Sequence, residues 1–167
     1  EADALVSGHS RSYPSVVKPM LQLVDKAPGA SIVATANIMM TKRGPMFFSD
    51  TAININPSAD DLAKIALMTA KTARMFGVEP VIAMVSYSNF GSSTNPSAGK
   101  VREAVAYLHE NYPDLCIDGE IQADFALNPE MLKAKFPFSK LADKKVNTLV
   151  FPNLESANIT YKLLKEL

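Results

Sequence analysis

The sequence lacks the features that mark several common classes of protein. It has one cysteine, so an intramolecular disulfide is excluded. Its 17 basic and 17 acidic residues cancel, and no basic run interleaved with aromatic residues points to nucleic acid. No apolar stretch approaches the roughly 20 residues that a membrane-spanning helix requires. We therefore expect neither a nucleic-acid partner nor a membrane association.

What is present is the composition of an ordinary globular domain. The 167 residues, 47% of them hydrophobic and 20% charged, suffice for one domain with a sizeable core. Cys116 lies between Leu115 and Ile117 in a predicted buried strand, so we interpret it as an inert thiol. The lack of paired cysteines is compatible with a cytoplasmic location, which we predict. No signal peptide is visible, and the first residue is Glu rather than Met, as in a fragment.

Apolar runs alternate with amphipathic segments, which predicts a mainly parallel sheet flanked by helices in one domain. Strands are expected at residues 4–6, 31–40, 46–49, 81–87, 115–117 and 146–151. Helices are expected at residues 15–24, 58–76, 100–110, 131–135 and 156–167. A turn at residues 41–45 joins two of the strands, which inserts an antiparallel hairpin into the pattern.

The helix at 58–76 has the clearest signals. Ser58 and Asp61 have the spacing of a capping box, and Gly77 ends the helix. Within it, small side chains recur on one stripe at Ala63, Ala66, Ala70 and Ala73. We expect a second copy of the chain to pack on this stripe, with a neighbouring helix of the same chain as the alternative.

A small, hydroxyl-rich loop follows the strand that begins at Val81. Its candidate ligand-binding residues are Ser88, Asn89, Phe90, Gly91, Ser92 and Ser93. Loops between a strand and a helix are common ligand sites in α/β proteins, so exposed backbone N–H groups here suit a phosphate or another anion. The glycine spacing and lysine of a Walker A loop are absent, and an ordinary polar connection is the alternative.

Three acidic residues and a glutamine follow the strand at 115–117, namely Asp118, Glu120, Gln122 and Asp124. Carboxylates close together can perform acid–base chemistry or bind a divalent metal, and the glutamine can orient a ligand. In the alternative, Asp118 and Gly119 form a turn and the acids cap a helix or pair with basic residues. No His or Cys accompanies them, so we expect no metal site.

Other strand-to-helix loops carry weaker signals. Residues 8–12 contain His9 and Arg11, residues 50–57 contain Asp50, and residues 152–158 precede the last helix. Each can supply hydrogen bonds to a ligand, or can simply satisfy its own backbone. His109 is expected to be exposed on a helix face, and no Ser–His–Asp arrangement can be inferred.

Taken together, these loops resemble the phosphate acetyltransferase family. The matching stretches are residues 2–8, 48–52, 54–57, 118–124, 151–154 and 158–162, which follow in the right order along nearly the whole chain. The resemblance implies the second domain of a two-domain, three-layer α/β/α fold similar to isocitrate and isopropylmalate dehydrogenases. It also implies a dimer formed through this domain. An acyl-CoA or a phosphate is the implied small-molecule ligand.

Three stretches favour a subgroup of this resemblance. Residues 88–93, followed by residues 96–98 and 100–104, look like the C-terminal region of hybrid NADP-dependent malic enzymes. In such a protein this chain would regulate and oligomerise, with acetyl-CoA as effector, and NADP and a divalent metal would serve the malic reaction elsewhere. The alternatives are a fragment of a genuine phosphate acetyltransferase and a plain oligomerisation module. The Ser-Arg pair and later Asp of active acetyltransferases have no match in the chain, so no catalytic residue is assigned and the chain alone is expected to be inactive.

Overall fold

The computed structural model describes residues 6–8 and 10–167, and the chain divides into two compact units, residues 1–33 and 34–167. The first unit contains helix α1 (Tyr13–Leu23), which confirms the helix predicted nearby and carries Pro19 in its interior. Most of the strand predicted at residues 4–6, and His9, lie outside the described residues. Val6 is described and is not part of a strand.

The second unit is built on one sheet. In the part of the chain that the structure describes, five strands pair in the order β1-β2-β5-β3-β4. They are β1 (Ala36–Thr41), β2 (Gly44–Ser49), β3 (Ile82–Val85), β4 (Ile117–Ile121) and β5 (Thr148–Val150). β1 and β2 form an antiparallel hairpin, whereas β2, β5, β3 and β4 run parallel to one another. This confirms a mainly parallel sheet with an inserted hairpin.

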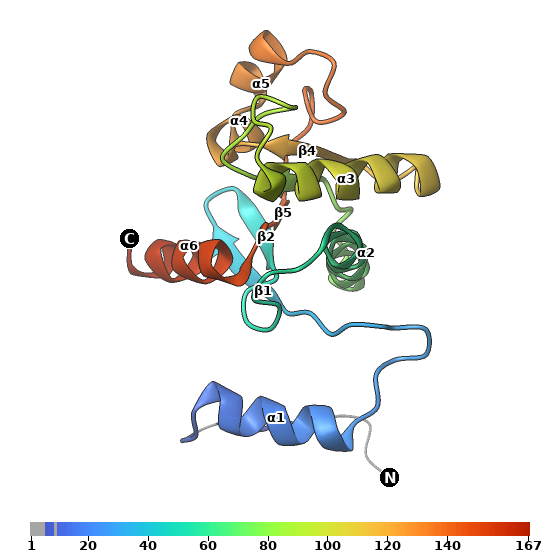
Figure 1. Cartoon of the computed structure of the whole chain (residues 1–167). Helices are drawn as coiled ribbons and strands as arrows, with labels where there is room; N and C mark the ends of the chain where they lie inside the picture. The colour runs from blue at the N-terminus through green and yellow to red at the C-terminus, as the bar shows by residue number, and fades with distance from the viewer. Residues whose placement is uncertain (1–5, 9) are drawn as a thin grey trace. The chain divides into compact units, whose positions relative to one another are not determined.

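Helices cover both faces of this sheet. They are α2 (Ala59–Met75), α3 (Pro96–Asn111), α4 (Ala123–Leu127), α5 (Pro129–Lys135) and α6 (Leu154–Glu166). Figure 1 shows α2 and α6 on opposite sides of β2 and β5, which gives three layers. The short helix α4 escaped the sequence analysis, and the likeness to the dehydrogenases stays a prediction. Within the described residues, no helix has the length and apolar character of a membrane span.

Helix α2 begins where the sequence predicted and buries the alanine stripe. The Ser58 hydroxyl accepts a hydrogen bond from the Asp61 amide at 3.1 Å, and the Asp61 carboxylate accepts one from the Ser58 amide. Ala63, Ala66, Ala70 and Ala73 are each at most 2% exposed within the single chain. Because α3 and the sheet already cover these side chains, the prediction that a second copy packs on the stripe is wrong.

Strand β4 ends at Ile121, four residues beyond the end of the strand predicted at residues 115–117. Gly119, interpreted as part of a turn, lies inside β4 with a φ of +149°. An added Cβ at this position would lie 2.5 Å from the Met84 carbonyl oxygen of β3. Only glycine permits so close an approach at this φ, so here the residue marks a close contact between strands and not a turn.

Candidate functional site

The candidate site lies at the carboxyl edge of the parallel strands. Four connections leave that edge, at residues 50–58, 86–95, 122 and 151–153. Backbone hydrogen bonds link neighbouring ones, from the Ser86 amide to the Ile121 carbonyl at 2.9 Å and from the Leu154 amide to the Ile55 carbonyl at 3.1 Å. The loops after β3 and β4 therefore lie side by side, because β3 and β4 are adjacent in the sheet.

Glu120 organises the loop after β3. Its side chain is completely buried, and its Oε1 atom accepts hydrogen bonds from the Ser88 hydroxyl and the Gly91 amide, each at 2.8 Å. The same oxygen accepts a third bond from Nη1 of Arg102 at 2.9 Å. Oε2 is buried and receives no donor from the described part of the chain. Glu120 is thus an internal anchor, and the sequence analysis was wrong to place it beyond the end of the strand.

The backbone of the Ser88–Ser93 loop is occupied by the protein itself. The amide of Phe90 donates to the Glu120 carbonyl, and the amide of Gly91 donates to its carboxylate. The amides of Ser88, Asn89, Ser92 and Ser93 all donate within residues 86–93. The expectation of exposed N–H groups is therefore wrong, because a buried carboxylate and loop oxygens occupy the donors that an anion would need.

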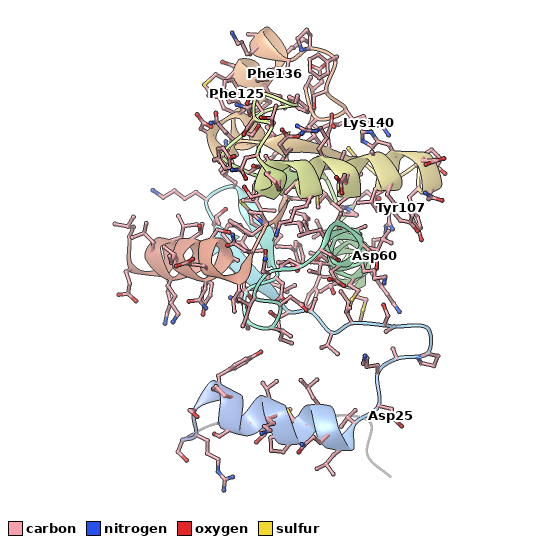
Figure 2. The ribbon with its side chains drawn as sticks, in the orientation of Figure 1. Asp25, Asp60, Tyr107, Phe125, Phe136 and Lys140 are labelled. Atoms are coloured by element: carbon pink, nitrogen blue, oxygen red, sulfur yellow. The ribbon has the colours of Figure 1, made fainter. Side chains whose placement is uncertain are left out.

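Phe90 faces an aromatic cluster. Its φ of +44° is unusual for a bulky side chain. The ring of Phe90 lies 5.0 Å from that of Phe136 and 5.1 Å from that of Phe138, measured between ring centroids. Phe125 of α4 lies 5.2 Å from Phe136, and Figure 2 shows these two rings close together. The cluster fastens the loop to the segment after α5.

Asn89 and Gln122 form a reciprocal pair across the two loops. The Asn89 amide group donates to the Gln122 side-chain oxygen at 2.7 Å, and the Gln122 backbone amide donates to the Asn89 side-chain oxygen at 2.8 Å. The Gln122 amide group also donates to the Tyr87 carbonyl at 2.7 Å. Both predicted site residues are therefore brought together, and their side chains join the loops.

Asp118 is also buried in β4, but the register between β3 and β4 shifts between Gly119 and Ile121, so Asp118 and Glu120 have different partners. The Asp118 carboxylate accepts bonds from the Ser139 hydroxyl at 2.8 Å and the Lys140 amide at 2.9 Å, which holds the segment after α5. His109 Nε2 lies 2.8 Å from the Ile117 carbonyl oxygen, so the prediction of a solvent-exposed histidine is wrong. Asp118 and His109 therefore hold neighbouring segments of the chain to β4.

Asp124 stands apart from the other two acids, exposed in the first turn of α4. Within the described residues, no group of three or more His, Cys, Asp or Glu side chains is placed to hold a metal ion. The interpretation of the three acids as one chemical cluster is wrong, because Asp118 and Glu120 are buried in β4 with separate partners and Asp124 begins a helix.

Asp50 has an internal role like that of Glu120. Its carboxylate accepts hydrogen bonds from the Thr35 hydroxyl at 2.6 Å, the Ala52 amide at 3.0 Å and the Asn54 amide at 2.7 Å. Burial alone raises the pKa of this carboxyl, but these hydrogen bonds outweigh burial and hold the pKa below its usual range. Asp50 therefore shapes the loop after β2.

Two basic residues at this edge were missed as site residues. Lys100 donates to the Asn56 side-chain oxygen at 2.7 Å and to the Pro57 carbonyl at 3.0 Å, and burial lowers the pKa of its ammonium group. Arg102 reaches Glu120 while its side chain remains 41% exposed. Their place just after the hydroxyl-rich loop, at the start of a helix, was the available signal.

Comparisons with known proteins decide the family. The family model described as phosphate acetyl/butaryl transferase matches residues 1–167. The chain belongs to this family. It is 41% identical over 170 residues to a phosphate acetyltransferase of Clostridium acetobutylicum, with 98% of this chain and 51% of the relative covered. It is 39% identical over 165 residues to a phosphate acetyltransferase of Escherichia coli K12, with 99% of this chain and 23% of the relative covered.

A solved member of the phosphate acetyltransferase family has the same fold. The phosphotransacetylase of Streptococcus pyogenes superposes with a TM-score of 0.87 at 42% identity, covering 95% of this chain and 49% of that one. The chain thus spans about half the length, or less, of the relatives named here.

Proposed function

We propose that this chain forms one wall of the active site of a phosphate acetyltransferase, which exchanges an acetyl group between CoA and phosphate. The observation that carries the proposal is the match along nearly the whole chain to relatives named phosphate acetyltransferase, at 39–41% identity. This was the alternative left open by the sequence. The reading as a regulatory region of a malic enzyme draws no support from these comparisons.

The reaction sets the demands on such a wall. The CoA thiolate attacks the carbonyl carbon of acetyl phosphate and a C–S bond forms. The bond between that carbon and the bridging oxygen breaks, and inorganic phosphate leaves with that oxygen. Both substrates are anionic, so the site must supply hydrogen-bond donors and positive charge. This chain offers the exposed hydroxyl-bearing residues Ser92 and Thr94 and the half-exposed guanidinium of Arg102. The buried carboxylate of Glu120 holds Arg102 and the Ser88–Ser93 loop, and such fixed placement favours a preorganised site.

The test uses the full-length protein that contains this chain. We expect acetyl-CoA to form from acetyl phosphate and CoA at a rate within the usual enzyme range of about 1–10³ per second. Malate and NADP, supplied with a divalent metal, are expected to give no NADPH, with or without acetyl-CoA. NADPH formation without acetyl transfer would reverse the proposal in favour of the malic enzyme. The 167-residue chain alone is expected to show no turnover.

Assembly and location are parts of the same proposal. Relying on the resemblance, we propose that the protein is cytoplasmic and forms a homo-oligomer through this domain. Because the alanine stripe of α2 is buried in the single chain, the contact must use another surface. Analytical ultracentrifugation of the full-length protein at micromolar concentration tests this, and a monomer would refute it.

A further inference from the structure

Arg102 is held at one edge of its guanidinium group. Its Nη1 atom donates to the buried Oε1 of Glu120 at 2.9 Å, and Nη1 and Nη2 both approach the Ser93 carbonyl oxygen at 3.5 Å. The contacts to Ser93 are at the outer limit of a hydrogen bond, so the contact to Glu120 sets the orientation. Glu120 therefore holds the Arg102 side chain, which extends from the second turn of α3, against the Ser88–Ser93 loop.

The opposite edge of the group remains available. A guanidinium carries five N–H donors in a planar fork. Nε has no acceptor within the described residues, and Nη2 has only the long contact to Ser93. Nε–H and the neighbouring Nη2–H point in the same direction, which is the geometry that grips two oxygens of one carboxylate or phosphate. The side chain is 41% exposed, so a ligand can reach it.

Arg74 of α2 shows how the Nε–Nη2 edge of an arginine binds a carboxylate in this protein. Its Nε and Nη2 atoms donate to the two carboxylate oxygens of Glu79, at 3.4 and 2.8 Å. Its side chain is 50% exposed, close to the exposure of Arg102. The same edge is therefore satisfied within the chain at Arg74 and left open at Arg102.

We propose that Arg102 binds a phosphate group of the substrate through its Nε–Nη2 edge, and that Glu120 is the positioning residue that presents this edge. The proposal rests on the proposed function, which brings two sources of phosphate to this edge of the sheet. One is the phosphate that accepts or donates the acetyl group, and the other is a phosphate of CoA. Both present the tetrahedral oxygens that a planar fork matches, and the experiment separates them.

The experiment measures KM values in the full-length protein for Arg102→Gln, Arg102→Lys and Glu120→Gln. Removing a charge-assisted double contact is expected to raise KM for the phosphate ligand at least about tenfold in Arg102→Gln. Arg102→Lys keeps the positive charge but lacks the planar pair of donors, so its KM is expected to lie between those of the parent protein and Arg102→Gln. Glu120→Gln is expected to raise the same KM while leaving kcat nearly unchanged, a split that general loss of stability would not produce.

The source of the phosphate follows from three ligands: inorganic phosphate, CoA and 3′-dephospho-CoA. If KM rises in Arg102→Gln for inorganic phosphate alone, Arg102 binds the phosphate that exchanges the acetyl group. If KM rises for CoA alone, Arg102 binds the 3′-phosphate of CoA. If KM rises for both CoA and 3′-dephospho-CoA, Arg102 binds the pyrophosphate of CoA. All three results support the proposal.

Arg74→Gln is the matched control, since it removes an arginine of similar exposure whose Nε–Nη2 edge already binds Glu79. KM values within twofold of the parent protein for all three ligands in Arg102→Gln would overturn the proposal, as would an equal rise in Arg74→Gln. If the full-length protein transfers no acetyl group, calorimetric titration with inorganic phosphate and with CoA still decides the role of Arg102. Binding that is unchanged in Arg102→Gln, or absent from the parent protein, would then refute it.

Discussion

Gly119→Ala is expected to destabilise the domain severely, although it adds a single methyl group. The new Cβ would lie 2.5 Å from the Met84 carbonyl oxygen and 3.0 Å from the Met84 Cβ. The first contact is to the backbone of a neighbouring strand, so a rotamer change cannot relieve it. The φ of +149° is also unfavourable for any residue with a side chain.

The two penalties can be estimated separately. Overpacking in a tight interior costs about 1–3 kcal/mol, and an L-residue in a glycine-type conformation costs about 1–3 kcal/mol. Their sum of about 2–6 kcal/mol is a large share of the roughly 5–15 kcal/mol that holds a typical domain together. For a domain of this size, each kcal/mol lowers Tm by about 2–4 °C. A fall in Tm of at least about 4 °C is therefore expected.

The assay is thermal unfolding followed by circular dichroism, with urea unfolding as a second measure. Gly99→Ala is the matched control, since the nearest atom to its added Cβ is Arg102 Nη2 at 4.0 Å. Gly99 lies within α3, where alanine is favoured over glycine by roughly 1 kcal/mol, so Tm should stay level or rise. A Gly119→Ala protein that melts within 2 °C of the parent would refute the close-contact explanation.

Three further predictions follow from single contacts. Ser58→Ala should cost about 1 kcal/mol by removing the cap of α2, and an unchanged urea midpoint would contradict it. Asp50→Asn should destabilise the domain near pH 7, because the folded pKa lies below the unfolded value of 3.8. The difference in unfolding free energy between Asp50→Asn and the parent should shrink as pH falls below about 4, because protonation of Asp50 removes the same stabilisation from the parent. A difference independent of pH would contradict this. Because burial raises the pKa of Cys116, alkylation by iodoacetamide at pH 8 should be slower than that of a free cysteine peptide, and an equal rate would contradict it.

Local signals in the sequence determined the elements whose cause is local. The capping box at Ser58 and Asp61 fixes the start of α2, and the turn at residues 41–45 predicts the hairpin of β1 and β2. Strand and helix alternation determined the class of sheet, because parallel strands need crossover helices. These features depend on residues close together in the chain, so a single sequence contains the information.

Contacts between distant segments decided the candidate site. Glycine after an aspartate is typical of a turn, yet Gly119 is a strand residue because β3 approaches it through Met84. Likewise, the sequence placed a polar loop at Ser88–Ser93 and acids near Glu120, but nothing local showed that one would fill the donors of the other.

What the sequence by itself determined, then, is that polar loops follow the strands at the carboxyl edge of the sheet, and the family to which the chain is similar. The tertiary structure decided which of those groups are already satisfied. Oε1 of the buried Glu120 accepts from the loop and from Nη1 of Arg102, which leaves the Nε–Nη2 edge of Arg102 open at the rim of the loop. That distribution of used and unused donors follows from strand adjacency and burial, which arise only when the chain folds.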